Sequence, residues 1–424
     1  MKNIKTYNII NKLPNSWERK KLSDICHLKN GYAFKSSNYV KEGIPLIRIS
    51  DIQDGEIVIH NTKKIKHNIK YNNYLIDEGD ILIAMSGATT GKFGIYLNKI
   101  KAYQNQRVGN FIILDKNILN NKFLFYKLFT LKLYIQKVAY GGAQPNISSK
   151  IIENIKIDLP PLSIQIKIVE IIDKLFNVLE KSVNELKKVL EKLIVYRQAV
   201  LSDAFSGKLT NKNLKNGELP KGWKYINFGN VVKEFIRGPF GSSLRKEFFV
   251  PFGYKVYEQK NAIYQNINLG KYFINENKYQ ELKRFEVKNG DYIMSCSGTI
   301  GKLFNIPQNA PKGIINQALL IIRIDKEKIL DNYFFYHFTS QNFQNLIIKD
   351  SKGTAISNLA GVKDLKKVPF LYCSLKEQQK IVEEIEKRFT ICDKIEEIIK
   401  ITFTKIDLMK QSILKKAFEG KLIN

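Results

Sequence analysis

An internal duplication constrains this 424-residue chain more than any other feature of its sequence. Landmarks recur in the same order, and their offset grows only from 206 residues at Trp17 and Trp223 to 213 at Ala204 and Ala417. Because composition alone cannot reproduce an ordered series of landmarks, we infer two copies of one folding unit. Further repeated pairs are Leu13-Pro14 with Leu219-Pro220, Gly79-Asp80 with Gly290-Asp291, Ser86-Gly87 with Ser297-Gly298, Gly91-Lys92 with Gly301-Lys302, Asn105-Gln106 with Asn316-Gln317, and Gln165 with Gln378.

The first part of each copy has the pattern of an α+β lobe. Short runs of apolar and β-branched residues are separated by turn-forming residues, as is typical of strands. A helical pattern follows near 121–136 in the first copy and near 331–347 in the second. The expected strands are 44–50, 80–86 and 108–114 in the first copy, and 291–297 and 318–324 in the second.

The second part of each copy has the pattern of one long helix. It follows proline at 160–161 or at 369 and then runs for about 40 residues without Pro or Gly. Apolar residues fall on two seven-residue tracks with alternating steps of four and three, which is the signature of a coiled-coil seam. The tracks contain Ile172, Phe176, Leu179, Val183, Leu186, Leu190, Leu193, Val200 and Ala204 in the first helix, and Ile385, Phe389, Cys392, Ile399, Phe403, Ile406, Ile413 and Ala417 in the second.

The two helices are expected to pair with each other, because Arg197 and Lys410 interrupt the same track at matching positions. A helix of about 42 residues spans roughly 63 Å, whereas the connection over 206–219 reaches at most about 45 to 50 Å. A parallel pair would require this connection to run back along the whole helix, so antiparallel pairing is favoured. Such pairing sends the two lobes to opposite ends.

The predicted fold class is therefore α+β, with two lobes separated by a long antiparallel two-helix coiled coil in a pseudo-two-fold internal repeat. A chain of this length is too long for one ordinary core. The expected divisions are a first lobe at 1–160, a central helix at 161–207, a linker at 208–219, a second lobe at 220–375 and a C-terminal helix at 376–424.

The charge of the lobes indicates a polyanionic partner. The formal net charge is +29, from 69 Lys and Arg against 40 Asp and Glu. Residues 1–160 hold 25 basic against 12 acidic side chains, and residues 220–375 hold 23 against 12. The helical ranges 163–207 and 376–418 are nearly balanced, with 7 against 6 and 10 against 8. A codon bias towards lysine would not spare the helices, so the excess favours a nucleic-acid surface on the lobes.

No motif for catalysis or for cofactor binding emerges from the sequence. The four cysteines and four histidines show no metal-ligand or disulfide spacing. The nuclease-like fragment at 281–283 has no counterpart in the first copy, and 158–162 lacks the aromatic residue of an adenine-methyltransferase loop. No apolar run approaches the roughly 18 residues of a membrane span. We therefore expect a cytoplasmic, non-enzymatic chain without a metal or cofactor of its own.

Two glycine-containing segments, 86–92 and 297–302, have some features of a phosphate-binding loop. Neither has four residues between its glycines, and neither has Ser or Thr after its lysine. Two interpretations stay open for each segment. It is either a tight turn that merely presents Lys92 or Lys302, or a turn whose lysine contacts a DNA phosphate.

The candidate DNA-binding residues are basic and amide side chains in expected loops. Arginine reads guanine, Asn and Gln read adenine, and lysine mostly holds phosphates. The Asn-Gln pairs that recur in both copies favour an architectural role, whereas residues that differ between the copies are better candidates for specificity. The candidates are Arg48, Lys63, Lys64, Lys66, Lys92, Gln104 and Arg107 in the first lobe, and Arg237, Arg245, Lys246, Gln265 and Lys302 in the second.

Together, several segments resemble the specificity subunits of type I restriction-modification systems. The resemblance covers nearly the whole chain, although the second copy departs from it at 250–254 and 376–379. The segments that carry it are L-P-x-x-W in both copies, G-I-P-L-I-R-I-S-D at 43–51, G-D-I-L-I-A-M-S-G at 79–87, N-Q at 105–106, P-P-L-S-I-Q-I-K-I-V at 160–169 and A-F-S-G-K-L at 204–209.

The resemblance implies that the lobes are target-recognition domains for the halves of a split, asymmetric double-stranded DNA target, and that the helices are spacers. It also implies a complex with two modification subunits, which bind S-adenosylmethionine and methylate adenine, and with restriction subunits, which use ATP and Mg²⁺ and cleave DNA. The alternative is a non-catalytic protein-assembly scaffold with two docking lobes on a coiled coil. Affinity for duplex DNA that falls steeply with salt would separate the two.

Overall fold

Two helices of 44 residues each, α3 (Leu162–Phe205) and α9 (Leu375–Phe418), follow the two lobes in the chain. α3 begins directly after Pro160-Pro161. Each helix ends just before a glycine with positive φ, Gly207 at 84° and Gly420 at 70°, a conformation that stops a helix without a Cβ clash. Among the described residues, no helix is long and apolar enough to cross a membrane.

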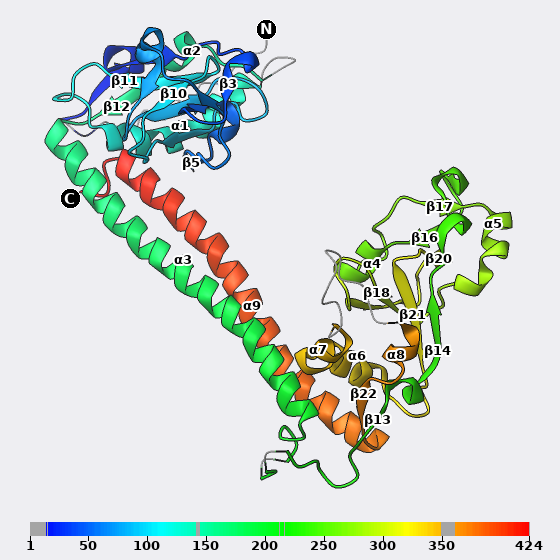
Figure 1. Ribbon diagram of the computed structural model, residues 1–424. Helices are drawn as coiled ribbons and strands as arrows, with labels where there is room; N and C mark the ends of the chain where they lie inside the picture. Colours follow the sequence, from blue (N-terminus) through cyan, green and yellow to red (C-terminus); the bar gives the residue numbers. More distant parts are fainter. Residues whose placement is uncertain are drawn as a thin grey trace. The chain divides into compact units, whose positions relative to one another are not determined.

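The computed structural model describes residues 14, 16–140, 145–211, 213–215, 217–348 and 361–423. The chain divides into two units, one of Met1–Glu185 with Lys400–Asn424 and one of Leu186–Ile399. Each unit contains one lobe together with part of α3 and part of α9 (Figure 1). Neither unit is therefore simply one sequence copy, because each draws on both helices.

The helices are antiparallel in both units. In the first unit the beginning of α3 packs against the end of α9, where Lys410 lies over the Phe176 ring, 5.5 Å from its centre. In the second unit the end of α3 packs against the beginning of α9, and Arg197 lies 4.9 Å from the centre of the Phe389 ring. The same cation-ring contact thus recurs with the helices exchanged, as expected for a two-fold repeat.

The heptad tracks coincide with the buried stripe of each helix. The residues directly before and after each track position in the sequence are mostly exposed. The buried members are Ile172, Leu179, Leu193, Val200, Ala204, Ile385, Cys392, Ile399, Ile406 and Ala417, and the half-buried ones are Phe176, Val183, Leu186, Leu190, Arg197, Phe389, Glu396, Phe403, Lys410 and Ile413.

Lobe one contains two five-stranded sheets, and α1 (Asn121–Ala139) packs with one of them. The sheet nearest α1 has the order β2 (Cys26–Asn30), β11 (Val108–Ile113), β8 (Ile81–Ala84), β9 (Phe93–Ile95), β5 (Gly55–Glu56). The other has the order β3 (Tyr39–Val40), β6 (Lys64–Ile65), β4 (Ile44–Ile47), β10 (Ala102–Gln104), β7 (Leu75–Ile76).

The buried strand β8 explains the continuous apolar run at this point of the sequence. Ile81 and Ile83 pack into the core beneath α1, whereas Leu82 and Ala84 pack into a second core against the other sheet. Successive side chains point to opposite faces of a strand, so a strand between two cores is apolar at every position.

Lobe two repeats this plan with two four-stranded sheets. One has the order β14 (Val232–Arg237), β21 (Leu319–Ile324), β18 (Tyr292–Ser295), β19 (Leu303–Asn305). The other has the order β15 (Phe249–Val250), β17 (Phe273–Ile274), β16 (Tyr254–Tyr257), β20 (Gly313–Ile315). Lobe two also contains the short helices α4 (Gln259–Ile263) and α5 (Glu276–Glu281). A further short helix precedes each long helix: α2 (Ser149–Glu153) in lobe one and α8 (Val362–Leu365) in lobe two.

The strands expected at 80–86 and 291–297 are shorter in the structure, as β8 and β18. Two further predicted elements also differ. The helical stretch expected at 331–347 is two helices, α6 (Asp331–Thr339) and α7 (Gln341–Ile348), because Ser340 adopts an extended backbone and its hydroxyl accepts the amide of Phe343 at 3.4 Å. The strand expected at 44–50 ends at Ile47, because the Asp51 carboxylate accepts the Arg48 amide at 2.8 Å and turns the chain.

A buried glutamine and a two-stranded sheet join each lobe to its helix. The sheets are β1 (Glu18–Lys21) with β12 (Lys156–Leu159), and β13 (Lys224–Asn227) with β22 (Pro369–Tyr372). Gln165 accepts the Asn120 amide at 2.8 Å and donates to two carbonyls, and Gln378 makes the equivalent three bonds in lobe two. The repeated glutamines are thus structural.

Candidate nucleic-acid interface

In lobe one, four basic candidates lie on neighbouring strands of the sheet that contains β4. Lys64 belongs to β6 and pairs with β4, Lys63 and Lys66 flank β6, and Arg48 directly follows β4. Lys63 and Lys66 are exposed, whereas Lys64 and Arg48 are half-buried. The fold therefore brings residues separated by up to 18 positions to one sheet.

Arg48 is held in place by the carboxylate that ends β4. Its Nε lies 3.7 Å from Asp51 Oδ2, and that same oxygen accepts the Arg48 amide. The Nε atom is buried and has no hydrogen-bond partner among the described residues. The guanidinium is thus positioned by its own turn, with a donor that no described residue uses.

Lys92 and Arg107 lie close together at the end of β8. The Lys92 carbonyl accepts the Ala84 amide at 2.8 Å, and the Arg107 carbonyl accepts the amide of the next residue, Met85, at 2.9 Å. Arg107 is exposed and Lys92 is half-buried. These two basic residues therefore flank the same strand end.

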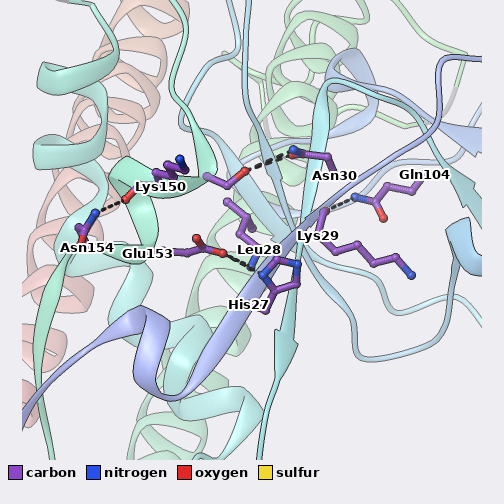
Figure 2. A network of polar contacts seen from close by, with 9 residues as sticks. His27, Leu28, Lys29, Asn30, Gln104, Lys150, Glu153 and Asn154 are labelled. Carbon is purple, nitrogen blue, oxygen red and sulfur yellow. Dashed lines mark hydrogen bonds and ion pairs between the residues drawn. The ribbon is translucent and has the colours of Figure 1, made fainter.

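Gln104 requires a correction. The prediction placed it in a loop as a DNA-binding candidate, but it is the last residue of β10 and is 1% exposed. Its amide nitrogen donates to the carbonyl of Lys29 at 2.7 Å (Figure 2). It also donates to the carbonyl of Val108 at 2.7 Å. A side chain whose donors are used inside the core cannot reach a base edge, and we remove it from the interface.

In lobe two, three candidates gather at the end of the sheet that contains β18. Arg237 is the last residue of β14, and Lys302 precedes β19, where its amide donates to the Ser295 hydroxyl at 3.0 Å. Gln265 has a φ of 49°, and its side-chain amide donates to the carbonyl of Leu303, the residue after Lys302, at 3.3 Å. Lys302 and Gln265 are exposed.

Arg245 and Lys246 lie apart from these three, in the loop that precedes β15. Both are exposed, and Arg245 lies 3.7 Å from the carboxylate of Glu247. An exposed pair at this distance contributes little to stability, so the arginine is available to an incoming phosphate.

The segment 86–92 is a hairpin turn between β8 and β9. Four of its backbone amides donate within the protein: Gly87 to Pro145, Thr90 to Gly87, Gly91 to Ala84 and Lys92 to Thr89. A phosphate-binding loop requires such amides to point at the phosphate. The hydrogen bonds argue against a phosphate-binding loop, and a contact between the Lys92 side chain and a DNA phosphate stays a prediction.

The recurring Asn-Gln pairs have equivalent positions in both lobes. The amides of Asn105 and Asn316 donate to Ile47 and Tyr257, and their carbonyls accept the amides of Val108 and Leu319. Each asparagine side chain also accepts a backbone amide two residues further on. These pairs shape a turn at the same place in each lobe, which supports the architectural role.

The possible metal ligands, the cysteine thiols and the cavity of the first unit do not indicate a second functional site among the described residues. Within the described residues, no cluster of three His, Cys, Asp or Glu could hold a metal ion. Burial raises the pKa of the Cys26 and Cys296 thiols to about 12 each, which disfavours the nucleophilic thiolate. A cavity of about 1220 Å³ in the first unit contains five lysines and five carboxylates among its lining residues and none of the DNA-binding candidates.

The family model for the type I restriction modification DNA specificity domain matches residues 14–192 and again 220–403. The chain is 27% identical to the EcoBI specificity subunit of Escherichia coli, over 96% of this chain and 86% of that one. It is 28% identical to a putative MjaX specificity subunit of Methanocaldococcus jannaschii, over 97% and 95%.

Solved structures show the same fold. A chain from a study of complex assembly and conformational transition of the type I R-M system superposes with a TM-score of 0.67 at 18% identity, over 97% of this chain and all of that chain. The specificity subunit of Thermoanaerobacter tengcongensis gives a TM-score of 0.53, also at 18% identity, over 97% and 98%. Because the family model matches each half of the repeat, the chain belongs to the type I restriction-modification DNA specificity family, with two copies of its domain.

Proposed function

We propose that this chain is the DNA-recognition subunit of a type I restriction-modification enzyme. Each lobe reads one half of a split, asymmetric double-stranded target, and the chain itself catalyses no reaction. The observation that carries this proposal is the match of a DNA specificity domain to both copies. The excess of basic residues in both lobes supports it, since phosphate neutralisation supplies much of the affinity for DNA.

The residues that we propose for DNA binding fall into two classes. Arg237 has no basic counterpart in lobe one, where Asn30 occupies the equivalent end of β2. Such differences suit base recognition, because the two half-sites differ. Lys92 and Lys302 occupy equivalent turns and suit phosphate contacts, which carry no sequence information. The further candidates are Arg48, Lys63, Lys64, Lys66, Arg107, Arg245, Lys246 and Gln265.

We further propose that two modification subunits dock on the outer faces of the long helices. Exposed apolar residues recur there at equivalent positions of α3 and α9, at a constant offset of 213 residues: Val178 with Ile391, Val195 with Leu408, and Tyr196 with Met409. Each unit contains one member of each pair. Equivalent surfaces on two units suit two copies of the same partner.

Catalysis then belongs to the partners. The modification subunits bind S-adenosylmethionine and methylate adenine, and the restriction subunits use ATP and Mg²⁺. The lobes and helices of this chain select the DNA and hold the partners on it. We propose that the chain works together with these partners in the cytoplasm.

Mapping of methylated bases in cells tests this function. The partner methyltransferase is expressed with and without this chain, and genomic DNA is sequenced by a single-molecule method that detects methyladenine. We expect a split motif to be methylated only when the chain is present. If the complex forms but no methylation depends on the chain, the proposal fails and the scaffold alternative is favoured.

A further inference from the structure

Because the chain is duplicated, equivalent edge strands of the two lobes can be compared. They are β2 in lobe one and β14 in lobe two. In lobe one this edge is β2, and α2 covers it. Glu153 accepts the amide of Leu28 at 2.9 Å and lies 3.0 Å from Nδ1 of His27 (Figure 2). A carboxylate thus pairs with an edge-strand amide that would otherwise face solvent.

The equivalent position in lobe two is a lysine. The amides of Leu22 and Phe228 donate to the carbonyls of Ile155 and Val368, and these matching bonds fix the alignment. Two residues before those carbonyls stand Glu153 and Lys366. The Lys366 ammonium lies 5.8 Å from the ring centre of Phe235 on β14. The two copies therefore carry opposite charges at one edge.

Lys366 belongs to a basic groove beside β14, which we name the β14 groove. Its volume is about 610 Å³, and six basic and two acidic side chains line it. The lining residues are Lys233, Glu234, Phe235, Ile236, Lys283, Arg284, Glu286, Lys288, Arg323 and Lys366.

Both acidic residues of the β14 groove already have partners. Glu234 accepts from Arg323 at 2.5 Å, and Glu286 accepts from the Tyr279 hydroxyl at 2.5 Å. Arg323 also donates twice to Asp291, at 2.9 and 3.1 Å, so its charge is compensated.

Four lining cations are left without such compensation. Lys283, Arg284, Lys288 and Lys366 are all exposed, and none forms an ion pair with a carboxylate in the described part of the chain. Lys288 attracts Glu234 and Lys283 attracts Glu276 only at longer range. Because basic side chains outnumber acidic ones six to two in the lining, the groove attracts a polyanion.

The chemistry of the lining suits a phosphodiester backbone better than bases. The lining contains no Asn or Gln, and its one aromatic ring, Phe235, is only half-exposed and lies near Lys366. Long, exposed cations position a duplex through its phosphates, whereas amides and stacked rings discriminate bases. Arg237, the proposed base-reading residue, lies three residues beyond Glu234 on β14, or about 10 Å along the strand.

We propose that the β14 groove holds the sugar-phosphate backbone that adjoins the bases read by lobe two, and that lobe one lacks this contact because Glu153 covers the equivalent edge. This inference rests on the proposed function. It makes DNA binding asymmetric: lobe two has an additional non-specific anchor, which strengthens binding without changing sequence preference.

The test compares variants of the full chain, in complex with its modification subunits, on a duplex that contains the mapped target. In the groove variant, Lys283, Lys288 and Lys366 are replaced by alanine. The control variant replaces three exposed lysines of lobe one outside the candidate set, Lys116, Lys150 and Lys156, and so removes the same charge.

For the groove variant we expect Kd to rise at least tenfold at about 0.1 M salt, and the slope of log K against log salt to fall by about three. The half-site preference should stay unchanged, and arginine at the same three positions should restore affinity. The control variant should match the wild type. Ethylation interference with the wild-type complex should identify stronger phosphate contacts beside the half-site of lobe two than beside that of lobe one.

Two outcomes would overturn the inference while leaving the proposed function intact. One is specific binding by the groove variant with unaltered affinity and salt slope. The other is loss of a partner subunit with unchanged DNA affinity, which would identify the groove as a site for an acidic protein segment. A wild-type complex that binds no specific sequence would instead refute the proposed function, and the inference with it.

Discussion

Single residues explain why some repeated positions are conserved between the two copies while others differ. Gln165 and Gln378 are identical because each saturates the same three backbone groups at a lobe-helix junction. Arg323 and Ile112 differ although both lie on the strand next to the edge strand, opposite Glu234 and His27. The arginine neutralises the buried Asp291, whereas the equivalent Asp80 bonds to Asn110 and burial raises its pKa.

His337 makes the second unit sensitive to acid. The ring is packed between Phe205, Phe343 and Phe370, and its burial lowers the pKa of His337 to about 3. In the unfolded chain a histidine takes up a proton near pH 6.5, whereas the His337 ring in the folded protein stays neutral at that pH. Its stabilising effect is therefore lost as the pH falls from about 6.5 towards 3.

At pH 4.5 this loss is expected to be about 2 to 3 kcal/mol relative to pH 7, from about 1.4 kcal/mol per pH unit. Urea unfolding at both pH values measures it. His337→Phe should remove this part of the pH dependence, whereas the same substitution at the exposed His60 should not. An equal pH dependence in the wild type and His337→Phe would contradict the assignment.

At the level of elements, the long helices were the most predictable part of the fold. Their heptad tracks were legible because burial on one face leaves a repeating apolar pattern. The short strands were less legible: β3, β5, β6 and β7 contain two residues each and leave no periodic signal. The break at Ser340 was also missed, since a serine within an apolar helical pattern does not reveal that it caps the next helix.

The candidate site was only partly predictable for the same reason. Basic residues such as Lys63 and Lys66 were chosen by type and by loop context, and the structure shows that both are exposed. Their contact with DNA stays a prediction. The prediction for Gln104 was wrong because the surrounding sequence resembles a loop, whereas its side-chain amide donates to two backbone carbonyls inside the lobe. The β14 groove could not be found from sequence, because Lys233 and Lys366 are far apart in the chain and only the fold brings them together.

The helix seam contains a polar contact whose replacement should stabilise the second unit. Arg197 forms ion pairs with Asp393 at 2.6 Å and with Glu396 at 3.1 Å, and its side chain is 22% exposed. Replacing half-buried ion pairs by packed apolar residues is often stabilising. We expect Arg197→Leu with Glu396→Leu to increase the free energy of unfolding by about 1 to 2 kcal/mol.

Thermal unfolding of the full chain measures this effect, with Lys192→Leu and Glu397→Leu, both exposed and outside the tracks, as the matched control. A lower Tm for the seam variant than for the wild type would mean that the ion pairs stabilise the seam beyond what leucines can replace.

For the molecule as a whole, we predict that the antiparallel helices act as a ruler: their length sets the gap between the two half-sites. One heptad corresponds to about 10.5 Å of helix, or about three base pairs at 3.4 Å each. Removal of one heptad within 172–200 together with its partner heptad in α9 should therefore shorten the gap of the methylated motif by about three base pairs. Both half-sites should keep their sequences, because the lobes are untouched. Methylation mapping measures the gap, and altered half-sites would refute the ruler.

The last turn of α9 has a consequence for biosynthesis. Leu414, Ala417 and Phe418 lie in the same core as α1 of lobe one, and the Phe418 ring contacts Phe123 with centres 5.2 Å apart. The second unit, in contrast, is continuous in sequence from Leu186 to Ile399. During translation, the lobe that is made first therefore acquires its complete core only after α9 has been synthesised. A product that ends before α9 would lack Leu414, Ala417 and Phe418 and would therefore expose part of this core.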